Sequence, residues 1–164
     1  MILGLFDLST YTIVHVIISL IAIVAGLIVV FGMLGSNRLE GWTALFLTTT
    51  VLTSLTGFGF PFERVLPSHI VGAISLLALL IAILAYYQFR LEGAWRWIYV
   101  VSALVALWFN VFVLIVQSFQ KIPVLAPLAP TQSEPPFQIA QGATLVLFIV
   151  LGILALRKFH PRPA

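Results

Sequence analysis

Apolar residues fill most of this chain in five long stretches that are separated by short polar segments. A helix that crosses the ~30 Å hydrocarbon layer of a bilayer needs about 20 such residues. The pattern therefore predicts an all-α, polytopic bundle of transmembrane helices that forms one domain over residues 1–164. The five predicted spans are 11–34, 41–60, 68–89, 95–119 and 138–157.

The second stretch is the most polar of the five, because hydroxyl side chains interrupt it repeatedly. A threonine hydroxyl can donate a hydrogen bond to the carbonyl of the preceding helical turn, which makes it tolerable in lipid. We therefore expect this stretch to cross the bilayer as well, with a bundle of four spans as the alternative. The hydroxyl residues are Thr48, Thr49, Thr50, Thr53, Ser54 and Thr56.

Composition supports the membrane assignment. Hydrophobic residues make up 62% of the chain and charged residues only 8%, whereas soluble domains carry about 25% charged residues. The net charge of +3 comes from so few groups that it gives no reason to expect nucleic-acid binding. The absence of cysteine excludes disulfides, thiolate metal sites and cysteine nucleophiles.

The distribution of basic residues among the loops predicts the orientation. Cytoplasmic loops of membrane proteins carry an excess of Lys and Arg. We therefore expect the C-terminal tail and the first and third loops in the cytoplasm, and the N-terminus outside with the second and fourth loops. The cytoplasmic set is Arg38, Arg90, Arg96, Arg157, Lys158 and Arg162, and the outer set is Arg64 and Lys121.

The fourth loop, residues 120–137, contains the proline-rich sequence KIPVLAPLAPTQSEPPF. Proline fixes the backbone dihedral φ and removes a hydrogen-bond donor, which excludes a regular helix or strand. Its apolar residues favour an ordered extracytoplasmic cover over the helix ends, and a flexible connector is the alternative.

A stripe of small and polar side chains follows the fourth predicted span. Ala103, Ala106, Asn110, Gln117 and Lys121 share one helical face. The stripe is small at its cytoplasmic end and polar at its outer end. Small residues allow close helix packing, so the stripe is either a packing seam or the wall of a pocket.

The first predicted span repeats this arrangement. Thr12, His15, Ser19, Ala22 and Gly26 share a face that is again polar toward the outside and small toward the inside. We expect Asn110 and Gln117 to face the protein interior and to share a polar cluster with His15.

All five spans bring polar groups to the outer half of the bilayer, whereas we expect the inner half to be almost wholly apolar apart from its boundary charges. Ionisable groups inside a membrane are functional candidates by default. The candidate ligand-binding residues are His15, Ser19, Thr53, Thr56, His69, Asn110, Gln117, Lys121, Gln138 and Gln141.

Several chemistries could use such a pocket. A quinone or a lipid head group needs only amide, hydroxyl and imidazole groups in an apolar slot, and this class fits the residue types best. His15 and His69 could instead ligate the iron of a b-type haem, or bind a metal ion with Glu63 or Glu134. No pattern of acidic or Ser/His/Asp groups favours hydrolysis, and the sequence leaves open whether the protein is an enzyme.

Transport is less favoured, because carriers usually show internal repeats and broken helices and none is evident here. The chain could also assemble as a homo-oligomer or serve as an accessory subunit of a larger membrane complex.

Three blocks of the chain also carry a resemblance: GWTALFLTTTVLTSLTGFGFPF, GAWRWIYVVSALVALWFNVFVLIVQSFQK and LAPTQSEPPF. They resemble a family of short, uncharacterised multi-span bacterial inner-membrane proteins. The resemblance implies a bacterial origin and a location in the inner membrane, and it assigns no functional residues.

Overall fold

The protein is a bundle of five α-helices, with every regular element helical in the part of the chain that the structure describes. That part of the computed structural model comprises residues 7–60 and 67–161. The helices are α1 (Leu8–Leu34), α2 (Glu40–Gly57), α3 (Pro67–Ile83), α4 (Ala94–Lys121) and α5 (Pro135–Lys158), with a π-helical turn η1 (Leu84–Gln88) and a 3₁₀ turn η2 (Ala126–Leu128).

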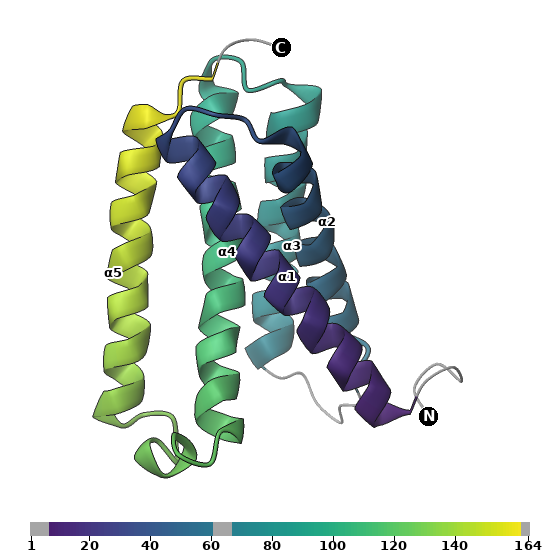
Figure 1. The fold of residues 1–164 in the computed structure, drawn as a ribbon, viewed down its shortest axis with the longest axis vertical. Helices are drawn as coiled ribbons and strands as arrows, with labels where there is room; N and C mark the ends of the chain where they lie inside the picture. The colour runs from purple at the N-terminus through teal and green to yellow at the C-terminus, as the bar shows by residue number, and fades with distance from the viewer. Residues whose placement is uncertain (1–6, 61–66, 162–164) are drawn as a thin grey trace.

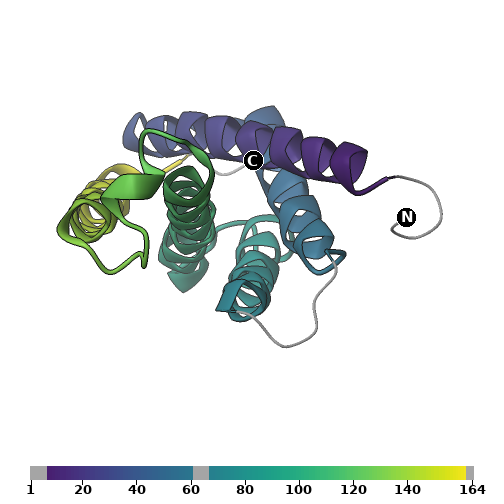
Figure 2. The same cartoon turned by 90° about the horizontal axis from the view of Figure 1, so that it is seen from below.

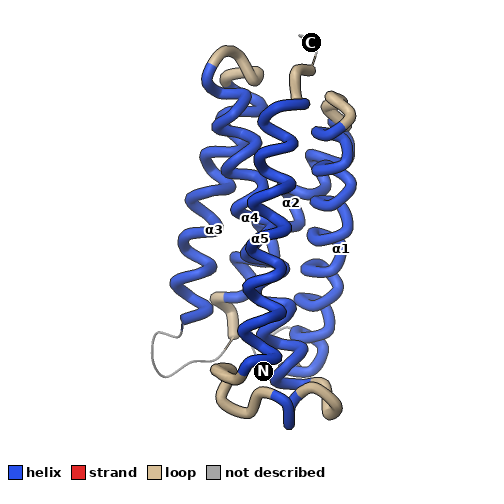
Figure 3. Tube along the Cα trace, turned by 90° about the vertical axis from the view of Figure 1, so that its left-hand side faces the viewer, coloured by secondary structure: helices blue, strands red, loops and turns tan. Residues whose placement is uncertain are grey.

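Consecutive helices run in opposite directions, so the two chain ends lie at opposite ends of the bundle (Figures 1 and 3). One end, which we call the basic end, holds the α1–α2 and α3–α4 connections and the C-terminus of α5. The other, the proline-loop end, holds the start of α1 and the α4–α5 connection. The described basic residues at the basic end are Arg38, Arg90, Arg96, Arg157 and Lys158.

Four of the described helical segments are long and apolar enough to cross a membrane: Leu8–Leu34, His69–Gln88, Ala94–Lys121 and Pro135–Lys158. The second helix, α2, is not among them, because threonine, serine and Glu40 lower its hydropathy. It ends at Gly57, three residues before the predicted end of that span. The exposed apolar side chains on the outer faces of the four segments are what a helix in contact with lipid requires, and they identify a helical membrane protein.

All five helices contribute to one buried core, which includes the point where α1 crosses α2 and α4. Gly26 marks this crossing, since a Cβ atom added to it would lie 2.5 Å from Cδ1 of Leu107 and 2.9 Å from the ring of Phe46. Ala22 and Ala106 are fully buried on either side. The small stripes of α1 and α4 are thus packing seams at this level, as small residues allow backbones to approach.

Side chains tie the connections together at the basic end. Nη1 of Arg96 donates to the carbonyls of Phe159 (2.8 Å) and Leu156 (3.2 Å), which satisfies the C-terminal end of α5. The amide of His160 donates to Oγ of Ser36 at 2.8 Å. These bonds join α4, α5 and the α1–α2 connection.

The half of the bundle near the basic end is more polar than the sequence suggested. Thr43 is fully buried there, and Tyr86 and Tyr99 are 5% and 1% exposed. The Tyr86 and Tyr99 rings lie 5.1 Å apart, and Cζ of Arg38 lies 5.3 Å from the Tyr86 ring centroid. This half therefore holds a buried hydroxyl and an aromatic cluster that the sequence did not indicate, and the boundary charge Arg38 makes a cation–π contact with that cluster.

The proline-rich connection lies against the end of α4. The Gln132 side chain donates to the carbonyl of Val116 at 3.1 Å, and Oε1 of Glu134 accepts from the amide and hydroxyl of Thr131 at 3.1 and 2.8 Å. Burial acts to raise the pKa of Glu134, but hydrogen bonds from Thr131 and Ser133 outweigh it and hold that pKa below its usual value. The loop lies at the ends of α4 and α5 (Figure 1), with α1 off to one side.

Candidate functional site

The candidate site is built on one side of α2, which carries Thr50, Thr53 and Thr56. We call these three residues the threonine face. Residues three apart on a helix differ by about 60° in direction and about 4.5 Å in height. Thr50 meets α4, Thr56 meets α1, and Thr53 lies between them in both direction and height. The site therefore includes two residues that the sequence predicted, Thr53 and Thr56, and one that it did not, Thr50.

His15 of α1 contacts the threonine face at its end nearest the proline loop. Its Nδ1 atom lies 2.7 Å from Oγ1 of Thr56, which also lies 2.7 Å from the carbonyl of Leu52. A carbonyl only accepts, so the single Thr56 hydroxyl proton points to Leu52 and Nδ1 of His15 must donate. In the neutral imidazole, Nε2 is then left with a lone pair as an acceptor or a base.

Tyr11 reinforces this contact. Its hydroxyl donates to the Thr56 carbonyl at 2.7 Å, and its ring meets Phe60 edge-on at 5.0 Å. The His15 ring meets the same Phe60 ring edge-on at 5.1 Å. Gly59 carries no Cβ where the Tyr11 hydroxyl approaches, so any side chain there would collide with it. Thr56 of α2 and Phe60, three residues after α2, thus both orient the His15 ring.

Asn110 of α4 contacts the other end of the threonine face. It is 9% exposed, and its Nδ2 donates to Oγ1 of Thr50 at 3.4 Å, a long and therefore weak bond. Asn110 faces the interior, as its stripe indicated. Its partner is Thr50, whereas the partner of His15 is Thr56, so the two residues reach the same helix about 9 Å apart along its axis.

Thr53, between these two contacts, has a buried hydroxyl that lacks a hydrogen-bond partner among the described residues. Its neighbours Thr49, Thr50 and Thr56 each donate to a carbonyl of the preceding turn at 2.7 Å. The expectation that the threonines bond to their own backbone holds for these neighbours and fails for Thr53. A hydroxyl left unpaired away from water costs about 1–3 kcal/mol.

The helices that flank Thr53 move apart toward the proline-loop end. On α4, exposure rises from zero at Ala106 to 9% at Asn110 and 38% at Leu114. On α1, Ala22 is fully buried, whereas His15, nearer the proline loop, is only half-buried. Figure 2 shows why, since the first half of α1 extends along α2 and away from α4. The side chains of α1 and α4 are therefore closely packed near Gly26 and more exposed toward the proline loop.

Three further candidates lie on α1 and α4. Oε1 of Gln117 is buried and has no partner among the described residues. Lys121 follows one turn later as the exposed last residue of α4, within electrostatic range of the His15 ring. The hydroxyl of Ser19 donates to the His15 carbonyl at 2.7 Å, so Ser19 is bonded to its own helix.

His69 lies on another side of α2. Its ring stacks on Phe58 with centroids 5.6 Å apart, whereas His15 approaches α2 from α1 at Thr56. The two histidines therefore contact different residues at the end of α2, and haem ligation by this pair stays a hypothesis. No group of three or more His, Cys, Asp or Glu within the described ranges could hold a metal ion, and Glu63 lies outside them.

The two glutamines of α5 have local partners. Nε2 of Gln138 donates to the Ser133 carbonyl at 2.7 Å and so supports the loop before α5. Nε2 of Gln141 donates to the Phe112 carbonyl of α4 at 3.1 Å, while its Oε1 is buried without a described partner. Both therefore join α5 to its neighbours, and neither has a recorded contact with the threonine face.

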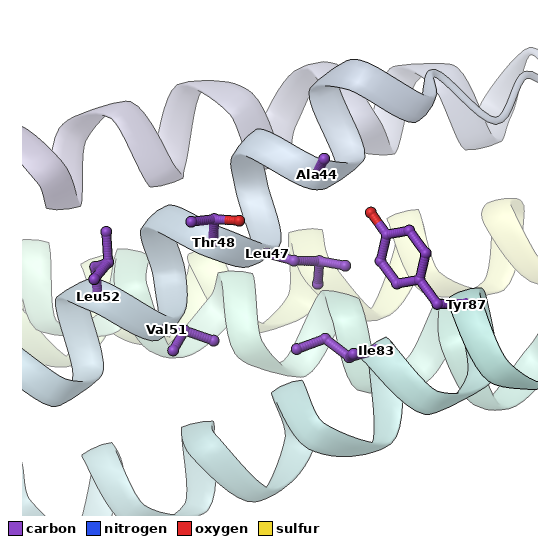
Figure 4. A pocket seen from close by; sticks show the side chains of 7 residues that line it. All are labelled: Ala44, Leu47, Thr48, Val51, Leu52, Ile83 and Tyr87. Atoms are coloured by element: carbon purple, nitrogen blue, oxygen red, sulfur yellow. The ribbon is translucent and has the colours of Figure 1, made fainter.

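A second opening, which the sequence did not indicate, lies on the opposite side of α2. It is a cavity of about 410 Å³ between α2 and the α3–η1 segment. Figure 4 shows Thr48 and Tyr87 with their hydroxyl groups at its wall. We call it the side groove, and the residues that line it include Ala44, Leu47, Thr48, Val51, Ile83 and Tyr87. No motif marks it, because it arises only where two apolar helices part.

Comparison with known proteins finds no matching family model, no similar curated protein and no similar solved structure. The resemblance to short bacterial inner-membrane proteins therefore stays a hypothesis, and the argument for function depends on the geometry above.

Proposed function

We propose that this chain is a five-span protein of the bacterial inner membrane, with its basic end in the cytoplasm, that binds the head group of a quinone-type ligand at the threonine face. The buried, unpartnered hydroxyl of Thr53 carries the ligand proposal. A polar atom at membrane depth needs a partner from the protein, from water or from a ligand. The partner at Thr53 would enter from the side on which α1 and α4 diverge.

The chemistry of the surrounding atoms supports a ligand that donates hydrogen bonds. Nε2 of His15 is an acceptor when Nδ1 donates to Thr56. Oε1 of Gln117 is a buried acceptor, and the hydroxyl of Thr53 accepts and donates. Two phenolic hydroxyls of a reduced quinone, a quinol, would suit such a set, and a hydroxylated lipid head group would meet the same demand.

The fifth span in this proposal is α2. Its 18 residues extend about 27 Å, close to the ~30 Å of the hydrocarbon layer. Its antiparallel neighbours α1 and α3 lie along it, and the chain enters and leaves it at opposite ends of the bundle (Figure 3). Three of its hydroxyls donate to the preceding turn, which makes them tolerable in lipid.

Fusions to compartment-specific reporters test the topology. Reporters placed after Arg38, Arg90 and Lys158 should report cytoplasm, because the basic residues cluster at that end. A reporter after Thr131 should report periplasm. A cytoplasmic signal at Thr131 would exclude five spans with this orientation. A further fusion point after Arg64 is predicted to be periplasmic, and it lies outside the described residues.

Bound quinones, measured by solvent extraction and mass spectrometry of the purified protein, test the ligand. Thr53→Val keeps the side-chain shape and removes the hydroxyl, so we expect it to lose bound quinone without loss of thermal stability. Thr144→Val is the matched control, because the Thr144 hydroxyl donates to its own helix at Ala140.

If Thr53→Val raises stability and leaves the extracted ligand unchanged, Thr53 is an unsatisfied packing residue and the ligand proposal fails. A visible absorption spectrum of the same preparation tests the haem hypothesis. A Soret band that disappears in both His15→Ala and His69→Ala would replace the quinone proposal by haem.

A further inference from the structure

With α2 as the proposed fifth span, on which this inference rests, the side groove lies at the depth of a lipid acyl chain. It is lined from Ala44 to Leu52 on α2, positions that begin about 6 Å and end about 18 Å along the helix from Glu40. Its walls are mostly apolar, and its volume of about 410 Å³ falls in the range of ligand pockets, roughly 300–1,000 Å³. Leu52 and Tyr87 are 41% and 52% exposed, so the groove opens sideways, toward the bilayer.

Two features of the sequence create this opening. On α2, the small Ala44 and Thr48 face it and leave space that larger side chains would fill. On the facing segment, the chain changes from α-helix to the π-helical turn Leu84–Gln88, which redirects Tyr87. Farther from the basic end the same helices are close, since the hydroxyls of Ser54 and Ser75 lie 3.4 Å apart.

Positive charge lies where the groove reaches the basic end. Cζ of Arg38 lies 5.3 Å from the Tyr86 ring centroid, and the Tyr86 and Tyr87 rings meet at 4.9 Å. Nε of Arg38 is buried and has no hydrogen-bond partner among the described residues. Arg90, three residues after Tyr87, is exposed. The rest of the half-buried Arg38 guanidinium and the exposed Arg90 supply positive charge, which attracts an anionic oxygen.

We propose that the side groove holds one acyl chain of an anionic phospholipid and that Arg38, assisted by Arg90, binds the phosphate. Basic pockets between transmembrane helices recognise anionic head groups in this way. The acyl chain lies along Ala44, Val51 and Ile83, and the hydroxyls of Thr48 and Tyr87 face the polar ester region or bound water. The proposal does not depend on the quinone site, which lies on the threonine face of α2.

Native mass spectrometry of the detergent-purified protein tests this inference. The probes are phosphatidylglycerol and phosphatidylcholine with identical oleoyl chains, added at equal concentrations. The wild-type protein should retain phosphatidylglycerol in preference. Arg38→Gln should lower that preference about fivefold, the ratio expected for one arginine at an anionic membrane surface.

Ala44→Phe fills the groove and should reduce retention of both lipids. Its control is Ala143→Phe, because Ala143 is likewise an exposed alanine but lies on α5, and this variant should behave as wild type. Equal retention of the two lipids by the wild-type protein, or retention unaffected by Ala44→Phe, would overturn the proposal.

Thermal unfolding of every variant is measured alongside, so that misfolding is not mistaken for lost binding. If Arg38→Gln proves unstable, Arg90→Gln and Ala44→Phe decide the outcome. An unchanged preference for phosphatidylglycerol in Arg90→Gln, together with unchanged retention in Ala44→Phe, would refute the site.

Discussion

The connections between antiparallel helices are held by different hydrogen bonds at the two ends of the bundle. At the basic end, side chains bond across connections that are distant in sequence: Arg96 to Phe159, and His160 to Ser36. At the proline-loop end, the recorded bonds of the loop remain within the α4–α5 pair, as that of Gln132 to Val116 does. The basic end is therefore held together as a unit, whereas α1 is free to diverge from α4 at the other end.

This difference explains where each candidate site lies. Where α1 and α4 diverge, the hydroxyl of Thr53 is buried and has no partner among the described residues. The tight basic end instead fixes an arginine on an aromatic cluster next to the side groove. A site for a ligand that enters and leaves needs the less constrained end, while a site for a structural lipid suits the constrained one.

Gly26 lies between the closely packed half of the bundle and the half in which α1 diverges from α4. Its replacement should have the largest effect on stability. In Gly26→Leu the new side chain meets Leu107 and Phe46, and overpacking of this kind costs about 1–3 kcal/mol and sometimes more. We expect a clear loss of thermal stability in detergent. Gly142→Leu is the control, since a Cβ there meets nothing within 4 Å. Equal stability of the two variants would show that the crossing at Gly26 is not tight.

Arg96→Met should have the next largest effect, because it removes the donor that satisfies the C-terminal end of α5. Hydrogen bonds that involve a charged group contribute about 1.5–3 kcal/mol. We expect a loss of about 2 kcal/mol and faster amide exchange over 155–160. Arg157→Met, at an exposed position on α5, should change stability by no more than about 0.5 kcal/mol. Similar losses in both variants would contradict the claim that Arg96 holds the basic end.

Thr56→Val should have a smaller effect, because it acts on the end that is less constrained. It removes the partner of His15 Nδ1 and leaves the Thr56 carbonyl that Tyr11 uses. Interhelical hydrogen bonds in membranes contribute about 0.6 kcal/mol on average, so stability should fall by about that amount. Chemical denaturation in mixed micelles measures it. A loss greater than that of Arg96→Met would reverse the comparison between the two ends.

Acidification should have the smallest effect and should act at the proline-loop end: on the loop, and on the first turn of α1, where Asp7 accepts from the Thr10 amide and its pKa is also lowered. The pKa of Glu134 is lowered below its ordinary value of 4.5 in the folded protein, so its stabilising bonds are present above that value. They are lost as the pH falls through the lower, folded pKa. Amide exchange at Thr131 and Ser133 should accelerate there, and Glu134→Gln should remove the pH dependence. Acceleration at Thr43 under the same conditions would show a global change instead.

The periodicity of the sequence predicts the helices because apolar length and backbone hydrogen bonding leave few alternatives in a membrane. Helix α4 was predicted at 95–119 and is observed at Ala94–Lys121. The sequence also predicted that Asn110 faces the interior, because the helical period places it on the same face as the small, buried residues of α4. The end of α2 was harder to predict, because Gly57, Phe58 and Gly59 fit the apolar pattern both inside and outside a helix.

The sites were only partly predictable, because stripe periodicity gives the direction of a side chain and not its partner. His15 and Thr56 were both candidates, yet their contact depends on the angle at which α1 crosses α2. Thr50 was overlooked as a partner of Asn110 for the same reason. Arg38 was assigned to a loop, and only the fold reveals that Tyr86, 48 residues later, lies beneath it.

The sequence alone determined that this is an apolar, helical protein with basic residues on alternate connections, since these properties follow from composition and local periodicity. The tertiary structure decided which polar groups are paired, because pairing depends on the crossing at Gly26 and on the spread of α1 from α4 beyond it. The same geometry left the hydroxyl of Thr53 and Nε of Arg38 without described partners. Their positions relative to neighbouring helices arise from packing between segments that are far apart in the chain.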